Sequence, residues 1–224
     1  MKEPINECYV RGENMTFKDE MTFQNYIYDV SDNGRIIAAL KSLPLKPFAS
    51  KVLCLWGGNS SGKTHLLHAI QKACRSARVK YITADQFCIN LACGIADNKV
   101  RKFEDSFNEV DILLLDDAQF LVGKYALEFL KERIISRIHC NVLLASDCDP
   151  YATGILKNNE IVLRLISPNS IVRLQVVRQK SSELQLQIDE SVQQLIATNI
   201  TDVRRITGFL TFLKATKESM PICP

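Results

Sequence analysis

The fold is decided by the stretch Val52-Leu53-Cys54-Leu55-Trp56, followed directly by Gly57-Gly58-Asn59-Ser60-Ser61-Gly62-Lys63-Thr64. The first five residues predict a short buried strand, and the next eight fit the phosphate-loop pattern G-x-x-x-x-G-K-[ST]. Such a loop wraps a phosphate chain when consecutive backbone N–H groups point inward, and glycines at 57 and 62 would allow that turn. We therefore predict that the eight residues 57–64 bind the phosphates of a nucleotide.

A helix is expected after this loop, because Leu66, Leu67 and Ile70 recur at helical spacing. The N–H groups and the positive dipole end at its N-terminus would point at the same anion. Lys63 would reach the β- and γ-phosphates, and the Thr64 hydroxyl would bind Mg²⁺. The alternative is a Gly/Ser turn that fits the pattern by chance, and the strand before it and the helix after it argue against that.

Composition predicts an ordinary globular protein. The 224 residues are 46% apolar and 24% charged, so the chain can bury a sizeable core, and the net charge of +3 gives no general attraction to nucleic acid or membranes. The eight cysteines form no C-x-x-C pair, which favours buried free thiols in a reducing compartment over disulfides or zinc. No signal-peptide core and no run of ~18 apolar residues is present, so we expect a cytoplasmic protein with no membrane partner.

A second candidate site element is the run Ile112-Leu113-Leu114-Leu115, which ends in Asp116 and Asp117. A nucleotide-binding sheet needs a buried strand beside its phosphate loop, with a carboxylate at the strand's carboxyl end. Asp116 would hold Mg²⁺ through water, and Asp117 would act catalytically by orienting the attacking water. Four apolar residues and two aspartates are a weak signal alone, but their place about 50 residues after a phosphate loop favours this function.

A further buried strand, 141–145, ends in Ser146 and Asp147, and a fifth strand is expected at 161–166. Either polar side chain could act catalytically by sensing the γ-phosphate or the attacking water. A simple turn or cap before Pro150 remains equally open. Strands that alternate with helices in this way predict an α/β fold with a parallel, doubly wound sheet.

The chain divides into four parts. Residues 1–20 show no periodicity and predict a flexible arm, and residues 21–166 form the nucleotide-binding core. From 167 to 216 the pattern is helical, with starts expected at Ser170, Asp189 and Thr201, and we call this part the helical lid. Residues 217–224 form a tail. Arg204 lies off the apolar face of the last helix, where it is either a surface charge or a phosphate contact.

Five blocks of this sequence resemble the AAA+ module of the bacterial replication initiator DnaA and, more closely, its shortened relative Hda, the regulatory inactivator of DnaA. The blocks are residues 23–27, 57–70, 113–121, 146–150 and 203–210. They occur in the family order, and the pairing of Gly-Lys-Thr-His-Leu-Leu with Asp-Asp-x-Gln-Phe-Leu is specific. The resemblance implies a P-loop AAA+ three-layer sandwich with a five-stranded parallel sheet, followed by a small C-terminal helical lid.

The resemblance also implies roles for individual residues, with ADP or ATP and Mg²⁺ as the cofactors. It places Tyr26 and Ile27 in the adenine pocket, Gly62, Lys63 and Thr64 on the phosphates with His65 beside them, Asp116 and Asp117 at the magnesium ion and water, Ser146 or Asp147 at the first sensor position, and Arg204 at the second. Arg204 is therefore expected to contact phosphate.

Three departures from the family narrow the expected function. The chain ends soon after Leu213, so no sequence-specific DNA-binding domain is expected. Between Pro150 and Pro168, where the family has an arginine finger, the only arginine is Arg164, within an expected strand. Such a finger is worth ~10³–10⁵ in rate, so this subunit should activate a neighbour's ATP poorly. Residues 1–20 contain no clamp-binding peptide, and residues 42–45 (Ser-Leu-Pro-Leu) are interpreted as a linker, which leaves binding to the DNA sliding clamp doubtful.

The leading functional hypothesis is a nucleotide-controlled regulator of replication initiation whose partners are DnaA or other AAA+ subunits, with at most weak ATPase activity of its own. The alternative is an ATP-hydrolysing loader or a protein that remodels single-stranded DNA through Lys99, Arg101 and Lys102, although a solvated helix face also explains these charges. A small-molecule kinase is a third hypothesis, but the sequence has no acceptor-binding signature for it.

Overall fold

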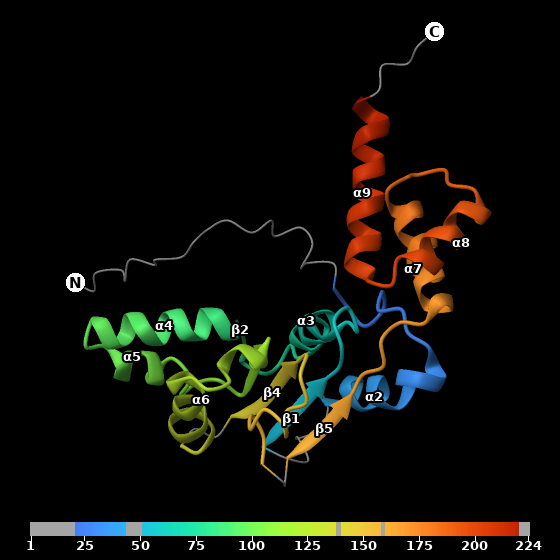
Figure 1. Cartoon of the computed structure of the whole chain (residues 1–224). Helices are drawn as coiled ribbons and strands as arrows, with labels where there is room; N and C mark the ends of the chain where they lie inside the picture. The colour runs from blue at the N-terminus through green and yellow to red at the C-terminus, as the bar shows by residue number, and fades with distance from the viewer. Residues whose placement is uncertain (1–20, 44–50, 138–139, 158–159, 220–224) are drawn as a thin grey trace.

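The computed structural model describes residues 21–43, 51–137, 140–157 and 160–219 (Figure 1). The predicted arm, the end of the predicted tail and residues 44–45 of the linker predicted at 42–45 lie outside these residues, and Ser42 belongs to α2. The strands form a five-stranded parallel sheet in the order β2-β3-β4-β1-β5. Their bounds are β1 (Val52–Trp56), β2 (Val79–Thr83), β3 (Ile112–Asp116), β4 (Asn141–Ser146) and β5 (Ile161–Arg164).

Helices cover both faces of this sheet, and three more helices follow it in the chain and form the lid. They are α2 (Val30–Ser42), α3 (Lys63–Ala73), α4 (Ala84–Ala96), α5 (Val100–Asp105), α6 (Tyr125–Phe129), α7 (Ser170–Glu183), α8 (Glu190–Asn199) and α9 (Val203–Ser219), with a 3₁₀ turn η2 (Ala118–Leu121) and a π-helical segment η3 (Leu130–Ile135). Within the described part of the chain, none of these helices is both long and apolar enough to cross a membrane.

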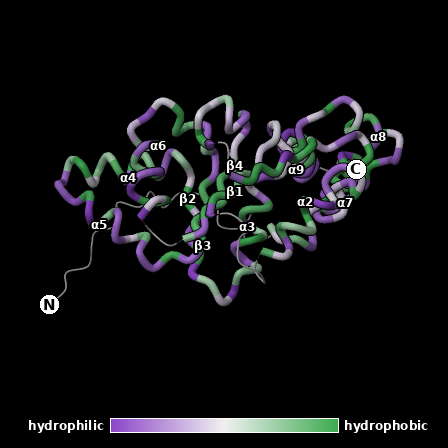
Figure 2. The backbone as a smooth tube through the Cα atoms, turned by 90° about the horizontal axis from the view of Figure 1, so that it is seen from below, coloured by the Kyte–Doolittle hydropathy of each residue, from purple (hydrophilic) through white to green (hydrophobic). Residues whose placement is uncertain are grey.

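The core has two halves because successive strand side chains point to opposite faces. On β1, Leu53 and Leu55 pack with α2 and α3, whereas Cys54 packs on the other face with Phe87 of α4 and Phe129 of α6. Figure 2 shows the hydrophobic colour gathered in the central strands. The three-layer α/β fold with a five-stranded parallel sheet is therefore confirmed.

The helical lid, α7–α9, has a small core of its own. Val177, Ile196, Ala197, Ile206 and Leu210 are buried among its three helices. Figure 1 shows this group, coloured orange to red, standing apart from the sheet. The lid therefore meets the nucleotide-binding core through a limited set of contacts.

The linker between β5 and the lid is fixed to α2 by polar contacts. The Asn33 side chain donates to Ile166 O at 2.9 Å and accepts from Ile166 N at 3.0 Å, and Asn169 Nδ2 donates to Asp29 Oδ2 at 3.0 Å. Asn33 is buried, and these bonds satisfy its amide. The start of the lid is thus anchored to the core through this linker.

Two predicted helix starts shift because the capping residue lies elsewhere. At α2, Asp29 is the cap and accepts from Ser31 N at 2.9 Å. Asn169, rather than Ser170, caps α7. Asp202, rather than Thr201, caps α9, accepting from Arg204 N at 2.8 Å and Arg205 N at 3.4 Å. Asp29 and Asn169 are extended residues directly before the first free N–H groups of their helices, as an N-cap requires.

Candidate functional site

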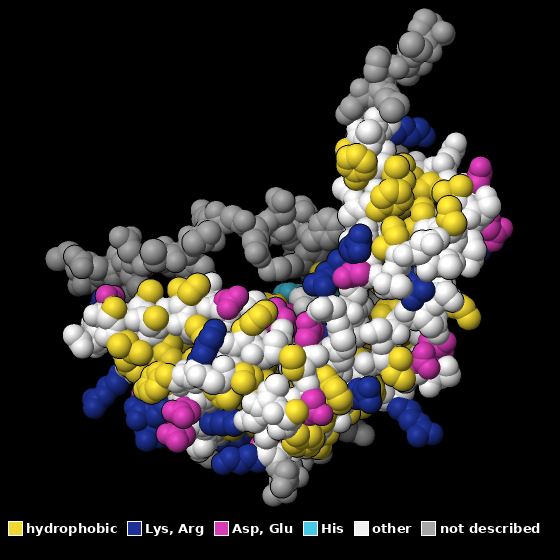
Figure 3. All heavy atoms as spheres, viewed as in Figure 1, with side chains coloured by type: hydrophobic (Ala, Val, Ile, Leu, Met, Phe, Trp, Pro, Cys, Tyr) yellow, Lys and Arg dark blue, Asp and Glu magenta, His cyan; other side chains and the backbone are white. Residues whose placement is uncertain are grey.

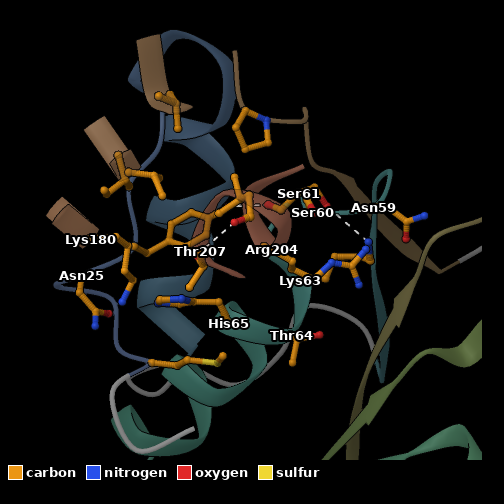
Figure 4. A pocket seen from close by; sticks show the side chains of 18 of the residues that line it. Asn25, Asn59, Ser60, Ser61, Lys63, Thr64, His65, Lys180, Arg204 and Thr207 are labelled. Carbon is orange, nitrogen blue, oxygen red and sulfur yellow. Dashed lines mark hydrogen bonds between the residues drawn. The ribbon is translucent and has the colours of Figure 1, made fainter. Parts of the chain in front are cut away.

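A cavity of about 510 Å³ lies between the phosphate-loop region, the segment 21–27 and the lid. This size suits a ligand of nucleotide dimensions. The core lines it with residues 59–65, Asp117 and Asp147, and the lid lines it with Val172, Val176, Gln179, Lys180, Val203, Arg204 and Thr207. In Figure 4, Asn25 and Lys180 lie toward one side of the cavity and Asn59 and Ser60 toward the other.

Most of the predicted site residues line this cavity. Tyr26, Ile27, the segment 59–65, Asp117, Asp147 and Arg204 do so. Gly57, Gly58, Asp116 and Ser146 do not belong to its lining.

Gly57 and Gly62 serve different purposes in the phosphate loop. Gly62 has φ +91°, which favours glycine, so it allows the predicted turn. Gly57 lacks a positive φ, and a Cβ there would lie 2.7 Å from Leu165 O and 2.9 Å from Ser61 Oγ. The prediction that Gly57 serves the turn is therefore wrong, because it is needed for the close approach of the β5 end.

Lys63 is held on the loop's own oxygens. Its Nζ donates to Gly57 O at 2.7 Å and to Gly58 O at 3.0 Å, and it forms an ion pair with the Asp147 carboxylate. Only 7% of the Lys63 side chain is exposed. A phosphate group entering the cavity would compete with these partners for the ammonium group.

The two candidates for a sensor at the end of β4 differ in where they point. Ser146 is fully buried, and its hydroxyl donates to Cys148 O at 2.9 Å and accepts from Cys148 N at 3.2 Å. This is the turn that the sequence left open as an alternative. Asp147 instead faces the cavity and Lys63.

The paired aspartates lie at the end of β3 with different surroundings. Asp116 is buried; its Oδ2 accepts from the Tyr81 hydroxyl at 2.9 Å and its Oδ1 from Asp117 N at 3.0 Å. Asp117 has φ +56°, a conformation that aspartate tolerates better than most residues. Burial, and next the charge of Asp116, raise the pKa of Asp117.

Tyr26 and His65 form a wall beside the loop. The Tyr26 hydroxyl donates to Ser61 O at 2.8 Å, and its ring centroid lies 5.1 Å from that of His65. His65 Nε2 lies 2.8 Å from Thr22 O, and because a carbonyl only accepts, this nitrogen carries the proton. Burial lowers the pKa of His65 and raises that of Tyr26, so both side chains are neutral near pH 7.

Arg204 lines the cavity but pairs with its own helix cap. Its NH2 lies 3.3 Å from Asp202 Oδ2, and the Ser60 hydroxyl of the phosphate loop donates to Asp202 Oδ1. The Arg204 side chain is 70% exposed. Asp202 thus touches both the loop and the arginine predicted to contact phosphate.

Comparison with known proteins identifies the family. Residues 17–162 match the family described as the bacterial DnaA ATPase domain. The chain belongs to this family. It is 30% identical over 210 residues to the chromosomal replication initiator protein DnaA of Oleidesulfovibrio alaskensis, covering 84% of this chain and 44% of that protein. The chain therefore spans less than half the length of that DnaA protein.

Solved DnaA structures share the fold. Domain III of Thermotoga maritima DnaA superimposes with a TM-score of 0.79 at 27% identity, covering 89% of each chain. A DnaA bound to AMPPCP and single-stranded DNA gives a TM-score of 0.73 at 24% identity, covering 87% of this chain and 64% of that one. The predicted AAA+ architecture is thereby confirmed.

Two side chains of this DnaA-family site were not singled out from the sequence. Gln119 Nε2 donates to Asp117 Oδ1 at 3.1 Å, while its Oε1 accepts from Asp147 N at 3.1 Å, so it joins the ends of β3 and β4. Tyr81 orients Asp116 from the neighbouring strand. The amide side chain two residues after the Asp-Asp pair was the available signal for Gln119, whereas the Tyr81 contact depends on strand order.

The DnaA-family site could hold Mg²⁺ only together with a bound phosphate compound, because it has few metal-binding side chains of its own. Among the residues that the structure describes, no three His, Cys, Asp or Glu side chains cluster as a metal site. Thr64 lines the cavity, and Asp116 is the last residue of β3, directly before Asp117, which also lines the cavity. Magnesium commonly uses one or two such protein oxygens and completes its shell with phosphate and water, so these residues fit the ion.

The neutral state of His65 predicts a pH dependence of stability. Because burial lowers its pKa below the ordinary 6.5, the unfolded chain binds a proton in a range where the folded protein does not. The contribution of His65 to the free energy of unfolding should therefore fall as the pH drops below 6.5. His65→Gln keeps a donor for Thr22 O but cannot titrate.

Urea denaturation at pH 7.5 and 5.5 measures this effect. The wild-type protein should lose more stability between the two pH values than His65→Gln does. Parallel losses in the two proteins would show that His65 does not titrate differently on folding.

Proposed function

We propose that this DnaA-family domain binds an adenine nucleotide, ADP or ATP with Mg²⁺, in the cavity between core and lid. The observation that supports it is the union, in one cavity, of a phosphate loop containing Lys63 with an apolar wall formed by Ile27, Val172 and Val176. A phosphate chain needs the first and a base needs the second. A related DnaA has been solved with AMPPCP bound.

In this proposal the chain's residues have distinct roles toward the nucleotide. Lys63 and the loop amides bind the phosphates, and Arg204 approaches them from the lid. Asp116 and Thr64 hold Mg²⁺, which when bound neutralises charge on the β- and γ-phosphates. Asp117, which lines the cavity, would orient the attacking water.

We further propose that the protein acts as a regulator of replication initiation of the Hda type, through nucleotide-dependent association with DnaA or another AAA+ subunit. Arg164, the only arginine between Pro150 and Pro168, lies on β5 with its guanidinium 4.8 Å from the centre of the Trp56 ring. A cation held against an aromatic ring at the sheet is poorly placed to act as an arginine finger. This favours a subunit that senses nucleotide over one that activates a neighbour.

The alternative is an ATP-hydrolysing loader that acts on single-stranded DNA, because a related DnaA has been solved with single-stranded DNA bound. Arg101 and Lys102 are exposed around α5, and Lys99 pairs with Asp97 at 3.2 Å. Three basic groups with an acidic partner make a weak patch for a phosphate backbone.

Two measurements separate these functions. The regulator should bind purified DnaA in the presence of ADP and show no DNA-stimulated ATP turnover alone. The loader should hydrolyse ATP alone and be stimulated by single-stranded DNA. The nucleotide released on denaturation of the purified protein, identified by chromatography, tests the nucleotide site itself.

Tyr81→Phe tests the proposed magnesium site. The variant keeps the ring, whose centroid lies 4.3 Å from that of His68, but removes the hydroxyl that orients Asp116. Loss of a group that orients a metal ligand costs about tenfold in metal affinity. We expect the Mg²⁺ concentration for half-maximal ATP binding to rise about tenfold, with metal-free binding unchanged.

The matched control for this prediction is Tyr125→Phe on α6, where the side chain is 62% exposed and outside the cavity lining. Titration of Mn²⁺ followed by electron paramagnetic resonance gives an independent reading of metal affinity. An unchanged metal dependence in Tyr81→Phe would remove Tyr81 from the site.

A further inference from the structure

Two cations that line the cavity, Lys63 and Arg204, are already paired within the chain. Lys63 is bound by Asp147, and Arg204 is bound by Asp202. Figure 3 shows dark-blue and magenta side chains next to one another at the junction of core and lid. A nucleotide would therefore meet cations that have anionic partners, not bare positive charges.

Asp202 of the lid contacts the phosphate loop of the core. One carboxylate oxygen accepts from the Ser60 hydroxyl, across 142 positions of sequence, and from the first amides of α9. The other oxygen faces Arg204 NH2 at 3.3 Å. One carboxylate thus links the phosphate loop, the helix start and the arginine.

The Asp202 carboxylate stays ionised in the folded protein. Burial would raise its pKa, but hydrogen bonds from Ser60 and Arg204 lower the pKa of Asp202 to about 2. Only 27% of its side chain is exposed. A fixed negative charge therefore lies beside the loop where phosphate is expected to bind.

We propose that Asp202 is a positioning residue that holds Arg204 and Ser60 in a latch, which a bound polyphosphate must open, and that it thereby weakens binding in proportion to phosphate charge. This inference rests on the proposed nucleotide site. Phosphate oxygens compete with Asp202 for both donors, and its charge repels them. ATP has one more phosphate than ADP, so it loses more when Asp202 holds Arg204 away, and it is repelled more strongly by the Asp202 charge. Asp202 therefore lowers the preference of the site for ATP over ADP.

Asp202→Asn tests the latch with little structural change. Asparagine caps helices as well as aspartate does, so α9 keeps its start while one negative charge is lost. From the Coulomb energy of charges several ångströms apart near a surface, we expect about tenfold tighter ATP binding and a smaller gain for ADP. Both gains should shrink in 1 M salt, because screening weakens the repulsion.

The matched control is Asp189→Asn, which removes the same charge at the start of α8, where the side chain is exposed and makes no capping bond. Asp202→Ser, another capping residue without charge, should act like Asp202→Asn. Binding can be followed by the fluorescence of Trp56, the only tryptophan of the chain, directly before the phosphate loop. Circular dichroism at rising temperature checks that each variant is folded.

A double-mutant cycle with Arg204→Gln separates the latch from simple repulsion. If Asp202 sequesters Arg204, the gain from Asp202→Asn should be several-fold smaller in the Arg204→Gln background. An equal gain in both backgrounds, an equal gain in Asp189→Asn, or no gain at all would overturn the latch. Failure of the wild-type protein to bind ADP or ATP would instead overturn the proposed nucleotide site.

Discussion

Lys63→Ala is expected to weaken ADP and ATP binding roughly 100-fold or more, about 3 kcal/mol. The variant removes the ammonium group that reaches into the phosphate loop, and it leaves Asp147 without its partner beside the cavity. An unpaired, partly buried carboxylate would repel the phosphates that Lys63 attracted. Isothermal titration calorimetry with each nucleotide measures the loss.

Two further variants show whether the loss comes from the missing Lys63 ammonium group, from the unpaired Asp147 charge, or from removing any lysine. Lys51→Ala removes a lysine at the opposite end of β1 from the phosphate loop, where no nucleotide contact is expected, and it should leave affinity unchanged. Lys63→Ala with Asp147→Asn should recover part of the lost affinity, because the unpaired charge is gone. Affinity in Lys63→Ala within threefold of wild type would exclude the phosphate loop as the binding site.

Gly57→Ala is expected to destabilise the fold by about 2–4 kcal/mol. The added Cβ would lie 2.7 Å from Leu165 O, a backbone atom that cannot move freely because Leu165 N donates to Trp56 O at 2.6 Å. Relief of the clash must separate the end of β5 from β1. Urea denaturation followed by circular dichroism measures the change in unfolding free energy.

Gly208→Ala is the matched control, because a Cβ at this exposed position within α9 meets nothing within 4 Å. Replacing a helical glycine with alanine should stabilise the protein by about 0.5–1 kcal/mol. The same substitution is thus expected to have opposite signs at the two glycines. A stability loss at Gly57 no larger than about 0.5 kcal/mol would mean that the chain relaxes around the added methyl group.

The fold was predictable because its signals are local. The run 52–64 combines a buried strand, a phosphate loop and a helix start within thirteen neighbouring positions. Runs of apolar residues ending in polar ones then located β3 and β4. Each of these patterns depends on residues adjacent in sequence, so a single sequence contains them.

The contacts that organise the site were not predictable, because they join residues that are far apart in the sequence. The Tyr81–Asp116 bond requires β2 to lie beside β3, and the Ser60–Asp202 bond requires the lid to fold back over the loop. A glycine at position 57 is required, as the phosphate-loop pattern indicated, but the reason is its close packing against Leu165, which depends on where β5 lies. Hydrogen bonds between elements follow from their placement in space, which periodicity does not encode.

The paired bonds between Asn33 and Ile166 give the lid a pivot. With the linker held there, the lid can respond to events at the phosphate loop chiefly by turning about that point. In Figure 1, α9 extends away from the sheet. This helix has 17 residues. At about 1.5 Å per residue it is about 25 Å long, so a tilt of about 10° would swing its far end by roughly 4 Å.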